Sequence, residues 1–136
     1  MITILHFKSY IFAYGIGSVP FLTSFFSTIQ HHLDPKKERY SLVLNELFMG
    51  RLQWQKADAA TEEVKEIREE LKRFAANQAV SDIENPNKPL PKEVRTEAAN
   101  LAEAFVNEDN ENLFDNLLAA LKDGMKYERD IEIVNL

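Results

Sequence analysis

The spacing of apolar residues changes along the chain, and each change marks a predicted element. Residues 2–13 are rich in β-branched and aromatic side chains without alternation, which predicts one central strand that is covered on both faces or bent by a bulge. Residues 14–18 break this strand, and Pro20 suits the first turn of a helix that ends at Asp34-Pro35. The apolar stripe of that helix comprises Phe21, Leu22, Phe25, Phe26, Ile29 and Leu33.

The next two apolar segments differ in how clearly they indicate a structure. Residues 40–49 are short and apolar, and their length and spacing fit either a strand or two helical turns. Asp58 is the expected N-cap of a strongly amphipathic helix, because an apolar face follows it at helical spacing. That face comprises Ala60, Val64, Ile67, Leu71 and Phe74.

The second half of the chain predicts a short strand, two helices and a closing strand. The short strand covers residues 79–83 and precedes a segment with three prolines. Helices follow over 94–105 and 113–121, and Gly124 is the expected terminator of the second. The closing strand covers 131–134. Strands near both ends that enclose helices predict a single α+β domain over 1–136, in which the N- and C-terminal strands share a small sheet packed against about four helices.

Composition and charge narrow the class of partner. The 136 residues are 45% hydrophobic and 28% charged, which is typical of one soluble globular domain, and the absence of cysteine excludes a disulfide framework. The net charge of −6 disfavours nucleic acid and anionic membranes as partners. Residues 82–136 carry six basic and thirteen acidic side chains, so the excess is C-terminal and a basic protein is the expected partner.

Residues 9–33 contain no charged side chain and have about the length of a membrane span. Hydroxyl side chains are scattered through the stretch, and Gly15, Gly17 and Pro20 interrupt its middle. The chain also lacks the basic residues that precede the apolar run of a secretory signal. We therefore expect a cytoplasmic protein without a membrane helix.

No catalytic or metal-binding motif stands out. Gly15-x-Gly17 between a strand and a helix resembles a phosphate-binding turn, but the third glycine is missing and Pro20 removes one amide, so a tight turn is favoured. His31 and His32 point in different directions on a helix and have no Cys or His-x-x-x-His partner. No serine lies in a Gly-x-Ser-x-Gly elbow. These patterns favour a protein without a metal, a cofactor or enzymatic activity.

Acidic residues supply the candidate site. Asp82 and Glu84 lie on one side of the predicted strand, a spacing that suits acid-base chemistry or merely a polar face. No basic residue lies between Arg95 and Lys122, and four acidic residues surround the N-terminus of the predicted 113–121 helix. Helix capping alone explains acids there, and a binding patch is the functional interpretation. The four residues are Glu108, Asp109, Glu111 and Asp115.

The order of the segments resembles the immunity protein 70 family over residues 15–134. The motifs are Gly17-Ser18-x-Pro20-Phe21 at the first helix, an Asn-Glu-Leu-aromatic-x-Gly-x-Leu run over 45–52, Asp82-Ile83-Glu84 before the prolines, and a last Ile-x-Ile strand. The run over 45–52 is the most specific of them. The chain departs from the family pattern at Ser81, at Asn85 and over 107–110, which suggests that it recognises a different toxin from its relatives.

The resemblance implies a bacterial immunity protein of a polymorphic toxin or contact-dependent inhibition system. Such a protein binds a cognate toxin and occludes its active site. An acidic C-terminal half suits a basic toxin, because complementary charge speeds association. Two alternatives stay open: a small α+β enzyme or ligand-binding domain that uses the turn over 15–18, and a structural or adaptor subunit.

Overall fold

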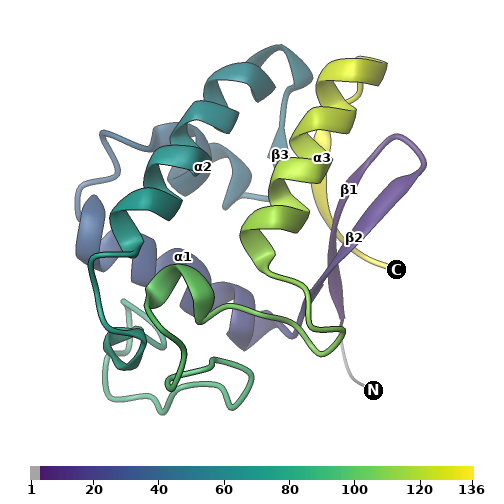
Figure 1. Ribbon diagram of the computed structural model, residues 1–136. Coiled ribbons are helices and arrows are strands. Elements are labelled where there is room, and N and C mark those ends of the chain that lie inside the picture. The colour runs from purple at the N-terminus through teal and green to yellow at the C-terminus, as the bar shows by residue number, and fades with distance from the viewer. Residues whose placement is uncertain (1–3) are drawn as a thin grey trace.

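The computed structural model describes residues 4–136 and contains a four-stranded antiparallel sheet with helices packed on one side of it (Figure 1). The strands are β1 (Leu5–Ser9), β2 (Phe12–Gly17), β3 (Arg51–Leu52) and β4 (Ile131–Asn135), in the order β2-β1-β4-β3. The α-helices are α1 (Val19–Leu33), α2 (Ala57–Leu71) and α3 (Leu113–Tyr127). A π-helix, η1 (Leu42–Leu47), and three short 3-10 helices complete the fold: η2 (Trp54–Lys56), η3 (Ala76–Gln78) and η4 (Leu101–Glu103). The α+β prediction is confirmed.

The pairing of the two terminal strand segments is also confirmed. β4 pairs antiparallel with β1, with Phe7 opposite Ile133, and its other edge pairs with β3. A segment near residue 50 therefore contributes an edge to the sheet. No helix of residues 4–136 is long and apolar enough to cross a membrane, and the uncharged stretch over 9–33 is divided between β2 and α1.

The N-terminal segment is a hairpin, so the prediction of a single strand over 2–13 was wrong; residues 2 and 3 lie outside the described residues. β1 and β2 are joined by Tyr10 and Ile11, and Tyr10 has a φ of 57°. Such turns favour glycine or asparagine, and neither is present here to signal a turn. Gly15 and Gly17, which we expected to break the strand, belong to β2.

α1 begins and ends as predicted. The Ser18 side chain accepts a hydrogen bond from the Phe21 N–H at 3.3 Å, and Pro20 lies in the first turn. At the other end, the buried Asp34 carboxylate accepts backbone N–H bonds from residues 38–40 and holds the loop that follows. Residues 42–47 then form the π-helix, so of the two structures considered for 40–49 the helical one occurs.

Two expected helix boundaries lie elsewhere. α2 begins at Ala57, because the 3-10 turn of η2 runs directly into it, and Asp58 lies in the first turn without acting as N-cap. Gly124 does not end α3, which continues to Tyr127 and is capped by Glu128 in a left-handed conformation with a φ of 54°. Gly124 is instead buried where α3 meets Ile131 of β4.

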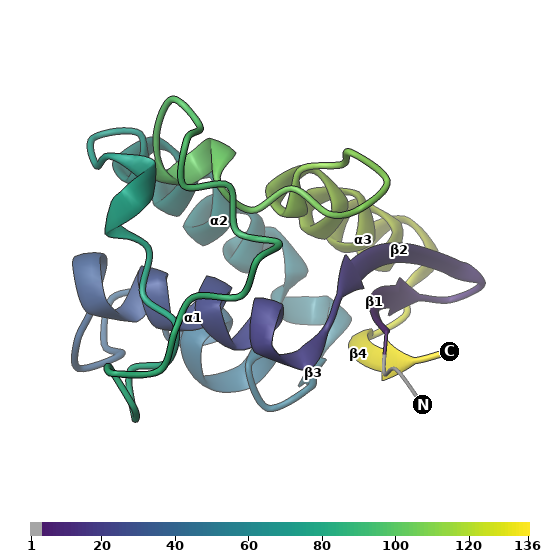
Figure 2. The same ribbon diagram turned by 90° about the horizontal axis from the view of Figure 1, so that it is seen from below.

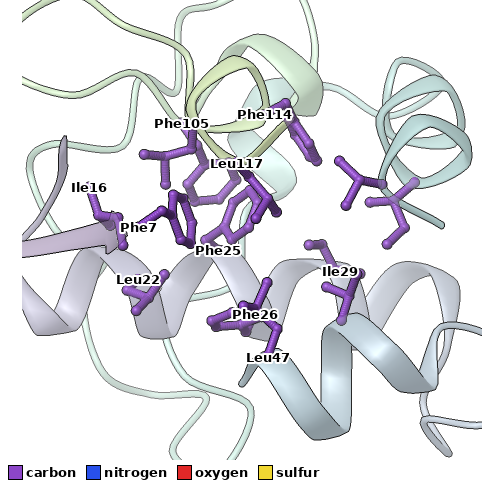
Figure 3. Close-up of a cluster of buried hydrophobic side chains, with 14 of the residues drawn as sticks. Phe7, Ile16, Leu22, Phe25, Phe26, Ile29, Leu47, Phe105, Phe114 and Leu117 are labelled. Atoms are coloured by element: carbon purple, nitrogen blue, oxygen red, sulfur yellow. The ribbon is translucent and has the colours of Figure 1, made fainter. Parts of the chain in front are cut away.

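The core lies between the sheet and the three α-helices and is rich in phenylalanine (Figure 3). Phe25 of α1 is central to it, with its ring centroid 5.4 Å from that of Phe105 and 5.1 Å from that of Phe114. These contacts join α1, the segment before α3, and α3 itself. Burial of such rings is the main stabilising term of the fold.

Candidate functional site

Residues 79–112 contain neither an α-helix nor a strand. Their regular structure consists of the short 3-10 helix η4 and one isolated bridge between Val106 and Asn112. The predicted strand over 79–83 and the predicted helix over 94–105 were therefore wrong. Most of the apolar residues on which that helix prediction depended are nevertheless buried, among them Val94, Leu101 and Phe105, whereas Ala98 is only partly buried. Long irregular segments that are ordered inside a compact domain are often functional loops, which makes this segment the candidate site.

Buried hydroxyl groups of α1 hold the first part of this irregular segment, which Figure 2 shows passing across α1. The Ser24 hydroxyl donates to the Val80 carbonyl at 2.6 Å, and the Thr28 hydroxyl accepts from the Val80 N–H at 2.9 Å. The Ser27 hydroxyl accepts from the Ile83 N–H at 3.0 Å. Val80 thus bonds to a helix through both backbone groups and has none left for a strand partner, which explains the failed strand prediction.

The second part of the segment is held by a hydrogen bond to the start of α1 and by another within the segment itself. Ser18, the N-cap of α1, donates a hydrogen bond to the Glu93 carboxylate at 2.5 Å. The Arg95 N–H donates to the Ala104 carbonyl at 2.8 Å, so the chain folds back on itself here and does not continue as a helix. Tertiary hydrogen bonds to α1 therefore fix the irregular segment at several points, in addition to the local turns within it.

An open groove of about 720 Å³ lies between residues 92–98 and the N-terminus of α3. Its apolar lining includes Val94, Ala98 and Val106. Its charged lining is mixed and comprises Lys92, Arg95, Glu97, Glu103 and Asp115. A groove with both apolar and charged walls suits a protein segment better than a simple ion.

The acidic loop, residues 107–111, lies beside this groove and is closed by the Val106–Asn112 bridge. Within it, the Asn107 N–H donates to the Glu111 carbonyl at 2.9 Å, and Asn110 has a φ of 63°, a value that asparagine tolerates well. Glu108 and Asp109 lie at the exposed tip. The loop therefore presents two carboxylates on a closed, hydrogen-bonded backbone.

The four acidic residues predicted as one patch have three different surroundings. Glu108 and Asp109 are exposed and form no ion pair with any residue of 4–136. Asp115 pairs with Arg68 of α2 at 2.7 Å, a cation that the sequence gap between Arg95 and Lys122 did not reveal. Glu111 accepts side-chain amide bonds from Asn107 and from Asn116 of α3. The tip pair is thus the freest to meet a partner.

Asp82 and Glu84 lie apart from this groove. They are not on a strand: the Asp82 carboxylate accepts the Glu84 N–H at 3.0 Å, which forms a tight local turn. Neither residue lines the groove. Their spacing therefore serves a turn and not a shared strand face.

The glycine pair considered as a phosphate-binding turn is also placed differently. Gly15 lies in β2, and its carbonyl accepts amide N–H bonds from Asn107 at 3.0 Å and Asn116 at 2.9 Å. Beside it, the Tyr14 hydroxyl donates to the Asp123 carboxylate, and this bond together with burial raises the pKa of Tyr14 to about 12. The end of β2 is thereby attached to both the acidic loop and α3.

The histidines form no metal site with other residues of the described chain. His32 contacts the Gln78 carbonyl through Nε2 at 2.8 Å, and its ring packs against Phe74. No group of three or more His, Cys, Asp or Glu side chains within 4–136 is arranged to hold a metal ion.

The model of the family described as Immunity protein 70 matches residues 7–133, which is nearly the whole chain. No curated protein and no solved structure matches it.

Proposed function

The chain belongs to the immunity protein 70 family, and on that premise we propose that it neutralises a cognate bacterial toxin by binding it and covering its active site. The protein contributes no chemistry of its own in this proposal. Its partner is a toxin domain with a basic surface, and the complex forms in the cytoplasm of the cell that is protected.

The observation that carries the proposal is the exposed tip of the acidic loop beside a groove, a tip that forms no ion pair within the described part of the chain. Glu108 and Asp109 project from a closed loop, and the adjoining groove of about 720 Å³ offers apolar and charged walls for a toxin segment. Charged groups at the rim of an interface mainly speed association, whereas buried apolar contacts slow dissociation. The loop tip and the groove therefore supply both parts of a binding surface.

The other candidate acidic residues are expected to contribute less to toxin binding. Asp115 lines the groove but is already paired with Arg68, so a toxin cation has to compete with that pair. Asp82 and Glu84 lie outside the groove and are the next candidates if the loop proves uninvolved. We expect Glu108 and Asp109 to dominate the electrostatic part of the association.

The experiment measures association of the toxin domain encoded by the adjacent gene with a Glu108→Lys/Asp109→Lys variant, at low and high salt. The expected result is slower association at low salt and a weaker salt dependence than wild type, because the steering charges are reversed. The matched control is Glu38→Lys/Glu62→Lys, which changes the net charge equally at exposed positions that do not line the groove. Equal association rates for the two double variants would refute the acidic loop as the contact.

A further inference from the structure

We propose that the acidic loop is held in its binding shape by a clip centred on Asn107, and that Asn107, Gly15 and Glu111 are positioning residues for Glu108 and Asp109. This inference rests on the proposed function, since it explains how the loop tip is kept ready for a toxin. It also assigns Glu111 a role different from that of a direct toxin contact.

Asn107 has every hydrogen-bonding position of its side chain engaged. Its Oδ1 accepts the N–H groups of Asp109 and Glu111, both at 3.0 Å. Its Nδ2 donates to the Gly15 carbonyl at 3.0 Å and to Glu111 Oε1 at 3.1 Å. A side-chain amide has two donors and two principal acceptor sites, so this one is fully used. With the residue only 6% exposed, few of these bonds can be replaced by water.

Gly15 provides the fixed point to which the clip attaches. Its carbonyl lies on edge strand β2 and also accepts the Asn116 amide from α3. A Cβ atom at position 15 would lie 3.3 Å from Asn107 Nδ2 and 3.9 Å from Glu111 Oε1. The first distance is tighter than an ordinary contact, so a side chain at position 15 would push the Asn107 amide outward by a few tenths of an ångström.

Glu111 acts through its oxygen atom rather than through its charge. Oε1 accepts the amides of Asn107 at 3.1 Å and Asn116 at 3.2 Å and so bridges the loop to α3. A glutamine presents an equivalent oxygen without a charge. Replacement by glutamine therefore separates the positioning role from a direct electrostatic contact with the toxin.

The functional consequence is preorganisation. A loop that is ordered before binding does not lose conformational freedom when the complex forms, so its affinity for the same contacts is higher. If the clip is released, Glu108 and Asp109 keep their charges but sample many positions. Complex stability then falls without any change in net charge.

The test combines amide hydrogen exchange, which needs no toxin, with toxin binding. In Asn107→Ala we expect exchange at the Asp109 and Glu111 amides to accelerate by about tenfold or more, the factor that corresponds to the loss of one hydrogen bond. The affinity for the adjacent-gene toxin domain falls by a similar factor while amides of α2 stay protected. Asn87→Ala, at an exposed position of the same irregular segment, is the matched control and should change neither quantity.

Glu111 gives the second, sharper arm. Glu111→Gln should leave both loop exchange and affinity near wild type, whereas Glu111→Ala should accelerate exchange and weaken binding. A Glu111→Gln variant that binds as weakly as Glu111→Ala, with the loop still protected, would show that Glu111 meets the toxin by charge and would overturn its positioning role.

The outcomes separate this inference from the proposed function. Unchanged loop exchange in Asn107→Ala refutes the clip, whatever the toxin does. Faster exchange with full affinity, in a protein whose binding is weakened by Glu108→Lys/Asp109→Lys, refutes the need for a preformed loop. If neither Asn107→Ala nor the double charge reversal alters binding, the toxin contact itself lies elsewhere and the proposed function of this surface fails.

Discussion

At Gly124, the absence of a side chain allows α3 to lie directly against the segment that follows it. A Cβ atom there would lie 2.6 Å from Ile131 Cδ1 and 2.9 Å from the Arg129 carbonyl oxygen. The isoleucine terminus can shift, but the carbonyl belongs to the backbone that leads into β4. Glycine near the end of a helix pattern ordinarily indicates a terminator, so only the position of β4 reveals its packing role.

We predict that Gly124→Ala destabilises the protein by about 1–3 kcal/mol, as overpacking of a tight contact does. This loss should exceed the gain of about 1 kcal/mol that alanine brings to a helix interior. Urea unfolding measures the difference, and Lys122→Ala, an exposed position in the same helix, is the control. A Gly124→Ala variant more stable than wild type would show that α3 and β4 separate readily.

Asn107 likewise illustrates which parts of the site a sequence reveals. The acidic residues around the start of α3 were visible as a charge pattern, and the helix N-terminus was correctly expected there. The clip was not, because Asn107 bonds to Gly15, 92 residues away, and an isolated asparagine has no local signature. Arg68 was missed as the partner of Asp115 for the same reason, since it comes from α2.

At the scale of elements, periodicity was a reliable guide where burial is on one side of a helix. It predicted α1, α2 and α3, whose buried residues recur at helical spacing. It failed over 79–112, where apolar residues are buried without forming a helix and backbone groups bond to side chains from elsewhere. In the sequence the hydroxyls of α1 argue only against a membrane span, whereas in the structure they hold this segment by hydrogen bonds.

We predict that Thr28→Val loosens the irregular segment. Valine keeps the shape of the side chain but leaves the Val80 N–H without its 2.9 Å acceptor, at a cost of about 1–3 kcal/mol for a buried unsatisfied group. Hydrogen exchange at Val80 should accelerate while α3 remains protected. Thr23→Val, on the same helix, is the control for replacing a threonine by valine. An equal effect at both positions would contradict the role of Thr28 in holding the irregular segment.

The contact between α2 and η1 should make stability depend on pH. Glu63 of α2 accepts the Val43 N–H at 3.1 Å, but its burial raises its pKa above the ordinary value. A carboxyl whose pKa is raised by folding favours the folded state most when protonated, so this contribution declines as pH rises through the unfolded and then the folded pKa.

Glu63→Gln keeps an acceptor oxygen and removes the titration. We therefore expect the variant to gain stability relative to wild type as the pH is raised from about 4, close to the unperturbed glutamate pKa, to about 7, well above it. Thermal melts at the two pH values measure the gain, and Glu62→Gln, at a neighbouring exposed position, is the control. A gain in the opposite direction would show that the hydrogen bonds to η1 outweigh burial.

At the scale of the whole molecule, the sheet joins the two ends of the described chain. Their pairing was predicted from the strand character of residues 131–134, but the position of β3 on the outer edge of β4 was not. β3 has only the residues Arg51–Leu52, too few for a pattern, and is fixed by its neighbours. Arg51 pairs with Asp130, whose carboxylate also accepts the Trp54 N–H, and both bonds lower the pKa of Asp130.

We predict that removal of residues 129–136 unfolds the protein. The deletion takes away the fully buried Ile131, worth about 1.5–3 kcal/mol, and leaves β1 and β3 without the strand between them. Together these losses are comparable with the total stability of an ordinary domain. Circular dichroism during heating measures the loss of folded structure. As the control, removal of Leu136 alone, which is 69% exposed, should leave the melting temperature unchanged. A cooperative melt of the longer truncation near that of wild type would refute the role of β4.

The place of β4 between β1 and β3 also determines when the sheet can form during protein synthesis. β1 emerges early from the ribosome, but its neighbour in the sheet is made more than a hundred residues later, after α3. Contacts this distant in sequence form slowly, and the nascent chain exposes an unpaired strand edge until residues 131–135 are available. The sheet, and with it the complete fold, therefore forms only after β4 has been synthesised.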